Sequence, residues 1–168
     1  REWTALVESK SGERGIFNRQ ASKKQAAKNG RRNSEWEFGT NPCSEIILRP
    51  YQFCNLSEVV VRATDDLKSL SNKVRLATII GTLQSSLTKF PYLRKVWQTN
   101  TEEERLLGVS LTGIMDNPLL TAKNKGLAQT LDHLRLVAVD TNKEWAERLG
   151  VQQSTAITCV KPSGTVSQ

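Results

Sequence analysis

The chain has 168 residues, of which 38% are hydrophobic and 24% are charged, and its formal net charge is +7. This length and apolar content suit one globular domain or part of a larger one, and they exclude fibrous and collagen-like proteins. The longest apolar runs are too short to span a bilayer, and the opening REWTALVESK lacks the apolar core of a secretory signal, so we expect a soluble protein of the cytoplasm.

Most of the positive charge lies at the start of the chain. Residues 1–33 contain nine Lys or Arg and three Glu, which gives this block a net charge of +6. Such a block is typical of a nucleic-acid-binding arm or of a solvated surface. Residues 23–32 lack the interleaved aromatic side chains on which single-strand binders stack bases, so a solvated surface is favoured. A basic nucleic-acid-binding module is kept as an alternative function.

The first predicted elements are a loop, a helix and two strands. Two glycines in residues 11–18 indicate a loop, and the helix formers that follow, ending in Asn-Gly, predict a short helix with a loop behind it. SEIILR at 44–49 and FCNLSEVVVR at 53–62 have the β-branched density of strands, with Pro-Tyr-Gln as the turn between them. A hairpin of these two segments would bring Cys43 and Cys54, eleven positions apart, near each other, but the sequence does not give their distance.

The rest of the chain alternates helices and strands. Long helices are predicted over 65–89 and 125–149, the second ended by Gly150. GVSLTG after an acidic helical turn predicts a buried strand, and a last strand ends at Lys161. The expected core positions of the two helices are Leu67, Leu70, Val74, Ala77, Ile80 and Leu83, then Leu127, Leu131, Leu134, Ala138 and Trp145. This alternation predicts an α/β fold.

Three side chains that carry chemistry alternate in Asn-Pro-Cys-Ser-Glu. In an extended tip Asn41, Cys43 and Glu45 point the same way, which would place an amide, a thiol and a carboxylate around one small space. The thiol can act as a nucleophile or give up a hydrogen, the carboxylate can accept a proton, and the amide can bind a polar substrate. A buried structural cysteine beside a solvated glutamate is the alternative.

Histidine and cysteine counts limit the chemistry further. A thiolate nucleophile of the usual kind needs a histidine partner, but the single histidine, His133, lies in the second long helix, where we expect a packing or surface role. With one histidine and three unevenly spaced cysteines, neither a zinc site nor a disulfide scaffold is expected.

The chain ends in KPSGTVSQ, a second candidate site. Backbone N–H groups, the hydroxyls of Ser163 and Thr165, and the close approach allowed by Gly164 make an anion cradle plausible at this loop. It is not a Walker loop, because the lysine precedes the glycine. A capped turn is the alternative. Together with a reactive cysteine tip, a phosphate cradle suits a phosphorylated polar substrate.

Several segments resemble one enzyme family. GTNPCSEIILRPYQFCNLSEVVV resembles the active-site finger loop of the ribonucleotide reductase large subunit, and KPSGTVSQ resembles its substrate-phosphate loop. SGERGIFNR and RLLGVSLTGIMDN resemble further family segments in the expected order, so the resemblance spans nearly the whole chain. The eleven-residue step from Cys43 to Cys54 is similar to the adenosylcobalamin-dependent class, and RPYQFCNLSEVVVR is most similar to its triphosphate-reducing branch.

The resemblance implies roles for individual residues. Cys43 would be the thiyl radical that removes the ribose 3′ hydrogen, generated with adenosylcobalamin, and Glu45 would be the base on the 3′ hydroxyl. Asn41 would hydrogen-bond the substrate, and Cys54 would be one of two reducing cysteines that form a disulfide as the 2′ hydroxyl leaves as water. The residues implied to hold the substrate phosphates are Pro162, Ser163, Gly164, Thr165 and Val166.

Some positions depart from the family pattern. Arg14 stands where many relatives have proline, and Ser44 stands where glycine is common. Cys159 matches no redox position of the family, so we expect an ordinary strand cysteine.

The resemblance also implies a fold and partners. The chain would be the central part of a ten-stranded α/β barrel with the radical cysteine on an internal finger loop. It would comprise a basic lead-in at 1–38, a finger-loop hairpin at 39–62, helices and a barrel strand at 63–150, and a strand with the phosphate loop at 151–168.

The implied partners are a ribonucleoside di- or triphosphate, a thioredoxin-type reductant and the remaining segments of the reductase, with no membrane. Those other segments would hold the second reducing cysteine and the C-terminal thiol pair. We therefore expect that the chain does not turn over by itself, and a non-catalytic remnant of the reductase is a further alternative.

Overall fold

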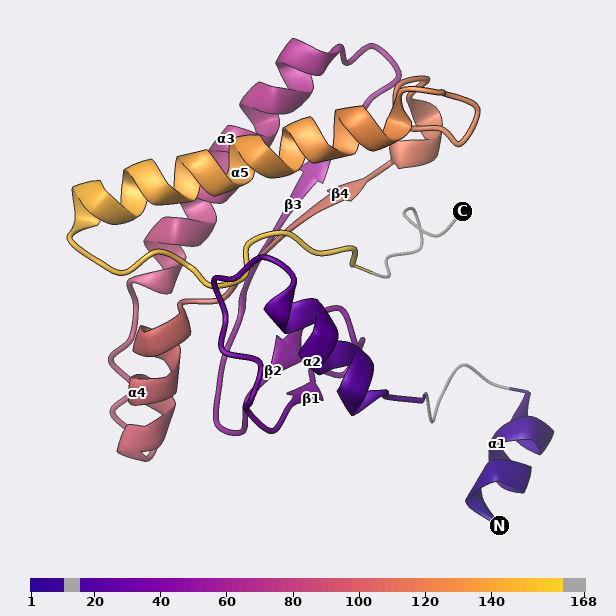
Figure 1. The fold of residues 1–168 in the computed structure, drawn as a ribbon. Coiled ribbons are helices and arrows are strands. Elements are labelled where there is room, and N and C mark those ends of the chain that lie inside the picture. Colours follow the sequence, from indigo (N-terminus) through magenta and orange to yellow (C-terminus); the bar gives the residue numbers. More distant parts are fainter. Residues whose placement is uncertain (11–15, 162–168) are drawn as a thin grey trace.

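The computed structural model describes residues 1–10 and 16–161, which form helices and strands of mixed α/β type (Figure 1). The elements are α1 (Glu2–Ser9), α2 (Arg19–Ala27), β1 (Gly39–Thr40), β2 (Ile47–Leu48), β3 (Asn55–Val60), α3 (Leu67–Ser85), α4 (Lys95–Glu104), β4 (Leu107–Thr112), a 3-10 turn (Ile114–Asp116) and α5 (Leu127–Leu149). The predicted α/β class is confirmed.

The centre of the fold is a pair of parallel strands. β3 and β4 pair over six residues, from Asn55 opposite Leu107 to Val60 opposite Thr112. On its other side β4 takes a third parallel segment, because the N–H of Val109 donates to Ile157 and its carbonyl accepts from Cys159 (2.8 and 3.1 Å). Residues 156–159 therefore extend the sheet along β4, although only one bridge forms there.

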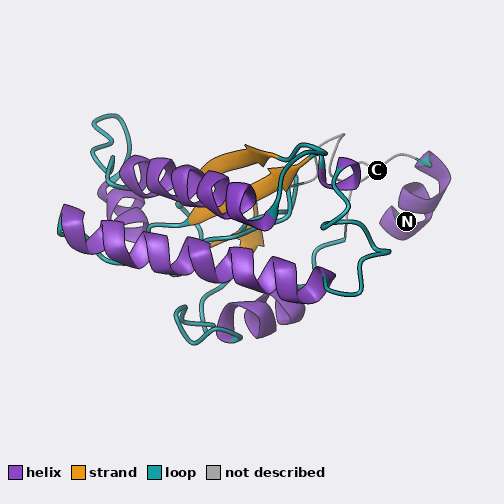
Figure 2. Ribbon diagram, turned by 90° about the horizontal axis from the view of Figure 1, so that it is seen from above, coloured by secondary structure: helices purple, strands orange, loops and turns teal. Residues whose placement is uncertain are grey.

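Helices α3 and α5 cover one face of this sheet. They pack against each other on the same side of the strands (Figure 2). The core between the layers includes Val59 of β3 and Val61 just after it, Leu107 and Val109 of β4, and Leu134 of α5. An added Cβ at Gly81 of α3 would lie 2.3 Å from Leu107 Cδ2, so the missing side chain lets α3 approach β4 closely.

The helix ends follow the sequence signals. Asp66 caps α3 in a capping box: its carboxylate accepts from Ser69 N–H, and Ser69 Oγ accepts from Asp66 N–H. Asn18 caps α2 by accepting from the N–H of Ala21 (2.9 Å). Gly150 ends α5 with a φ of 64°, as predicted for a C-terminal glycine.

The buried face of α3 differs from the prediction. Leu70, Val74 and Ala77 face the core as expected, but Ile80 is 60% exposed and Leu83 is 42% exposed. Leu67 and, on α5, Leu131 are also exposed rather than buried. The core side of α3 instead continues through Thr78, Gly81, Thr82 and Ser85.

The predicted hairpin between 44–49 and 53–62 is wrong. β2 pairs with β1 in an antiparallel hairpin that closes within residues 39–48, and β3 pairs with β4 instead. The two pairs belong to separate two-stranded sheets among the described residues. The ten-stranded barrel stays a prediction. In the described part of the chain, no helix has both the length and the apolar character that crossing a membrane requires.

Candidate active site

The cysteine loop connects β1 to β2 and is held by its own hydrogen bonds. The Asn41 side chain accepts from the N–H of Ile46 (3.0 Å), and the N–H of Asn41 donates to the Ile46 carbonyl (3.3 Å). Thr40 Oγ1 donates to the same carbonyl (3.0 Å). The side-chain oxygen of Asn41 is thus used inside the loop, while its NH2 group has no hydrogen-bond partner among the described residues and can donate to a ligand.

The tip of the loop is a turn rather than the extended strand that was expected. The N–H of Ser44 donates to the Asn41 carbonyl (3.0 Å), and Ser44 has a φ of 65°, in the left-handed region that favours glycine. That conformation explains why glycine suits this position. It also removes the alternation that would have aimed Asn41, Cys43 and Glu45 in one direction, and no hydrogen bond joins these three described side chains.

Cys43 and Glu45 have different surroundings. Cys43 is exposed at the turn, whereas Glu45 is half-buried. Glu45 lines a cavity of about 680 Å³ whose wall also includes Ser110 and Cys159. Its Oε2 atom is buried and has no hydrogen-bond partner among the described residues. The carboxylate is therefore free to accept a proton or a hydrogen bond from a molecule in the cavity.

Two further thiols lie within electrostatic reach of Glu45. Burial raises the pKa of the Cys54 thiol, and the Glu45 charge raises it further. Burial raises the pKa of the Cys159 thiol to about 12, with Glu45 and then Cys54 as the next contributors. Both thiols therefore stay protonated near neutral pH, and all three cysteines are free.

Gly108 makes room for this arrangement. A Cβ at Gly108 would lie 2.4 Å from Leu56 Cδ2, 2.9 Å from Ile46 Cδ1 and 3.2 Å from Cys159 Sγ. The missing side chain of Gly108 thus leaves room for the Ile46 and Cys159 side chains on one face of the sheet.

A buried ionic network holds the base of the loop. Arg32 donates to both carboxylate oxygens of Glu104 (2.8 and 2.9 Å) and to the carbonyl of Ile47 in β2 (2.8 Å). Gln52 also donates to Glu104 and accepts from the N–H of Arg49. The Arg32 and Glu104 side chains are 4% and 5% exposed. β2 is therefore fixed to the end of α4, far from it in sequence.

The structure leaves some predicted site residues untested. Residues 162–166 of the phosphate loop lie outside the described residues. Cys54 and Glu45 are brought into one neighbourhood, but the structure gives no contact between Cys43 and Cys54.

His133 is exposed and its Nε2 lies 3.0 Å from Ser71 Oγ, which fits the expected surface role. Among the described residues, no group of His, Cys, Asp and Glu is arranged to hold a metal.

Sequence reasoning missed Cys159, Gly108 and the Arg32–Glu104 pair. A strand cysteine two residues before the proposed phosphate loop was the only signal for Cys159. The glycine of GVSLTG was seen only as a strand flank, and Arg32 was counted only as part of the basic block. Part of that block has partners within the chain: Arg19 and Lys23 lie 3.8 and 3.6 Å from Glu37 at the surface, and Arg32 is buried against Glu104.

The chain is similar to curated reductases. It is 30% identical to the adenosylcobalamin-dependent ribonucleoside-triphosphate reductase of Lacticaseibacillus paracasei over 98% of this chain and 25% of the relative. It is 30% identical to the protein of the same name from Lactobacillus gasseri over 77% of this chain and 20% of the relative. The Lactobacillus leichmannii protein of that name is 28% identical over 77% of this chain and 21% of the relative. No family model matches the chain.

A solved structure agrees with these relatives. The crystal structure of a B12-dependent, class II ribonucleotide reductase superposes with a TM-score of 0.59 and 27% identity, over 77% of this chain and 21% of that one. The chain spans about a fifth to a quarter of the length of the relatives it matches. Its homologues are adenosylcobalamin-dependent ribonucleotide reductases, which confirms the resemblance drawn from the sequence motifs and supports the implied cofactor.

Proposed function

We propose that this chain is a segment of the catalytic subunit of an adenosylcobalamin-dependent ribonucleotide reductase, which converts ribonucleoside triphosphates to deoxyribonucleotides in the cytoplasm. The observation that carries the proposal is Glu45: its buried Oε2 without a protein partner lines a cavity, on a loop that also exposes the Cys43 thiol. The naming of the relatives as triphosphate reductases supports the substrate. The segment completes its ten-stranded barrel together with the remaining segments of the reductase.

The exposure of Cys43 fits an outside radical source. In this chain Cys43 lies open at the tip of its turn, so a group held by another segment of the reductase can reach the thiol. When bound, adenosylcobalamin supplies the radical chemistry that takes the hydrogen atom from this thiol. The residues that bind the cofactor itself lie mostly in other parts of the reductase.

Each of the three side chains of the loop has a different role in the reaction at the ribose. The Cys43 thiyl radical removes the 3′ hydrogen atom and returns it to the same carbon after the 2′ hydroxyl has left, and Glu45 takes the proton of the 3′ hydroxyl. The side-chain NH2 group of Asn41 donates a hydrogen bond to the substrate, because the side-chain oxygen already accepts one from the N–H of Ile46. The loop hydrogen bonds and the Arg32 contact to β2 hold these groups in place.

The reduction consumes two thiols. Cys54 and a second cysteine from another segment give two electrons and two hydrogens, the 2′ hydroxyl leaves as water, and the two sulfurs form a disulfide. The raised pKa of Cys54 keeps its hydrogen in place until then. A thioredoxin-type reductant restores the dithiol. The residues Pro162, Ser163, Gly164, Thr165 and Val166 hold the substrate phosphates.

A chimaera tests the proposal. The matching quarter of the Lacticaseibacillus paracasei reductase is replaced by this chain, and deoxyribonucleotide formation from CTP is measured with adenosylcobalamin and a dithiol. We expect activity in the chimaera, its loss in Cys43→Ser, and a large decrease in Glu45→Gln. The exposed Glu35 provides a matched control, so Glu35→Gln leaves the rate unchanged.

Two results would contradict the proposal. Equal activity of Cys43→Ser and the parent chimaera would remove the radical role of Cys43. A folded chimaera with no activity would favour the non-catalytic remnant. The isolated chain is expected to be inactive, since the second reducing cysteine is supplied by another segment.

A further inference from the structure

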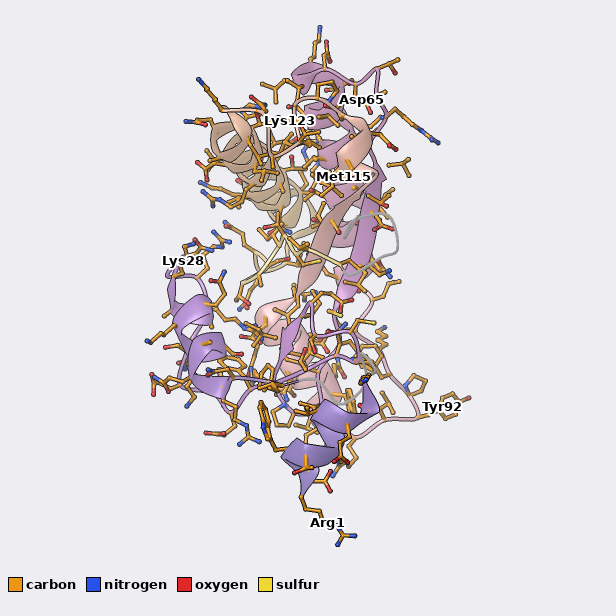
Figure 3. The ribbon with its side chains drawn as sticks, turned by 90° about the vertical axis from the view of Figure 1, so that its right-hand side faces the viewer. Arg1, Lys28, Asp65, Tyr92, Met115 and Lys123 are labelled. Atoms are coloured by element: carbon orange, nitrogen blue, oxygen red, sulfur yellow. The ribbon has the colours of Figure 1, made fainter. Side chains whose placement is uncertain are left out.

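Three cationic side chains line the cavity where α2 approaches α5. Lys28 and Arg31 follow the end of α2, and Arg135 belongs to α5. Figure 3 shows Lys28 on the side of α2 nearer to α5. These residues come from segments more than a hundred positions apart, and none of them belongs to the cysteine loop or to residues 162–166.

Arg31 is short of partners. Its Nε atom is buried and has no hydrogen-bond partner among the described residues, and no described carboxylate forms an ion pair with it. Burial lowers the pKa of Arg31, and the neighbouring charge of Arg135 lowers it further, so the two guanidinium groups repel each other across the cavity. Arg31 is half-buried, but a buried N–H without an acceptor is still costly, and an anion between the two arginines would remove that cost.

The cavity wall also contains two carboxylates, which neutralise part of its positive charge. Arg135 donates its Nε and Nη2 to Asp132 Oδ1 (3.0 and 2.8 Å), and Asp132 is exposed. Glu45 is the other carboxylate on the wall. Arg32 also lines the cavity, but Glu104 neutralises it. With Arg32 neutralised, the described part of the wall has three cations, Lys28, Arg31 and Arg135, against two carboxylates, so its net charge is +1.

We propose that Arg31 and Arg135, with Lys28, bind the phosphate chain of a di- or triphosphate in this cavity. Guanidinium groups match phosphate oxygens with two parallel hydrogen bonds, and lysine adds a point charge. A volume of about 680 Å³ is in the range of small-molecule sites, and apolar side chains such as Leu131 and Ile114 on the wall suit a less polar part of the same ligand. These three side chains do not belong to residues 162–166, but they share their cavity with Glu45, so the inference rests on the proposed function for its nucleotide and not for its phosphate binding.

Calorimetric titration of the chain at low salt tests the site. The probes are sodium tripolyphosphate, CTP and cytidine, and the variants are Arg31→Gln and Arg135→Gln. Arg62→Gln is the matched control, because Arg62 is exposed and lies outside the cavity wall. Far-ultraviolet circular dichroism checks that each variant is folded. If Arg31→Gln does not fold, Arg135→Gln still tests the site, because Arg135 is half-exposed.

We expect tripolyphosphate and CTP to bind and cytidine not to bind. Each cavity variant raises the Kd of both phosphate probes roughly tenfold or more, and Arg62→Gln leaves it within about twofold. Similar Kd values for the two probes identify the phosphate chain as the ligand, and tighter CTP binding identifies a nucleotide. The proposal is overturned if the parent binds no tripolyphosphate, if the cavity variants bind as well as the parent, or if Arg62→Gln weakens binding equally.

Discussion

At the scale of single residues, the three cysteines differ most in their surroundings. Cys43 is exposed on its turn, whereas Cys54 and Cys159 are half-buried beside the Glu45 charge. Thiolates rather than thiols react with alkylating agents, so a thiol whose pKa is about 12 is almost inert near neutral pH. At pH 8 its thiolate fraction is about one in ten thousand.

Alkylation should therefore be selective. In the folded chain at pH 8, we expect iodoacetamide to modify Cys43 at least roughly tenfold faster than Cys159, because only Cys43 is open and uninhibited by burial. The rate at Cys159 should keep rising with pH up to about 12, since its raised pKa delays thiolate formation. Peptide mass spectrometry measures both rates.

Unfolding in urea serves as the control, and there the cysteines should react at similar rates. Rapid modification of Cys159 in the folded chain would show that it is not buried beside Glu45.

Sequence motifs located the candidate residues on the cysteine loop but not their neighbours. The short pattern around Cys43 is local, so it could be recognised without knowing the fold. The neighbourhood of Cys159 depends on the pairing of 156–159 with β4 and on the bare backbone of Gly108, and both relate residues some fifty positions apart. Such long-range pairing leaves no periodic signal in either segment.

At the scale of the elements, helices were predictable where caps and periodicity agreed. Asp66 and Gly150 mark ends of α3 and α5 close to where they were expected. The face of α3 was misassigned because its apolar residues at Ile80 and Leu83 continue the spacing set by Leu70 and Val74. Hydrophobic spacing alone does not separate a core stripe from an exposed one.

The buried hydroxyls of α3 explain the error. Thr78 Oγ1 donates to the Val74 carbonyl and Thr82 Oγ1 to the Thr78 carbonyl, each at 2.8 Å, and Ser85 Oγ donates to the Thr82 carbonyl at 2.7 Å. Each hydroxyl satisfies its donor within its own helix, so these small side chains can be buried without an unpaired donor. The core-facing side of α3 therefore contains small hydroxyl side chains as well as apolar ones.

Paired truncations on α3 check this assignment. Leu70→Ala should lower the free energy of unfolding by about 2–5 kcal/mol, since Leu70 is fully buried in the core cluster. Leu76→Ala should change it by about 0.5 kcal/mol or less, because Leu76 is 61% exposed on the opposite side. Urea unfolding followed by circular dichroism measures both. Equal losses would mean that Leu76 is covered in the folded chain.

At the scale of the whole molecule, Arg32 and Glu104 connect parts that are far apart in sequence. Arg32 follows α2, Glu104 ends α4, and Gln52 and Ile47 lie between them along the chain. Removing one member of a buried pair leaves the other charge without compensation, which costs more than the pair itself contributes.

Glu104→Gln should therefore destabilise the chain strongly. We expect the free energy of unfolding to fall by about 3–5 kcal/mol, because Arg32 loses its charged partner while buried. Glu144→Gln is the control: Glu144 pairs with Arg75 at 2.8 Å but lies near the surface, so the urea midpoint should change little. A comparable shift in both variants would show that burial does not distinguish the two pairs.

The register of β4 determines which length changes the chain can accept. Leu107 and Val109 face the helices, while Gly108 and Ser110 face the cysteine loop and residues 159–161. One inserted residue between Arg105 and Leu107 would exchange these two faces, because side chains alternate along a strand. Leucine would then occupy the space beside Ile46, and glycine would lie beneath α3. Insertions and deletions during evolution should therefore be tolerated between α3 and α4, where no register is set, and be eliminated within β4.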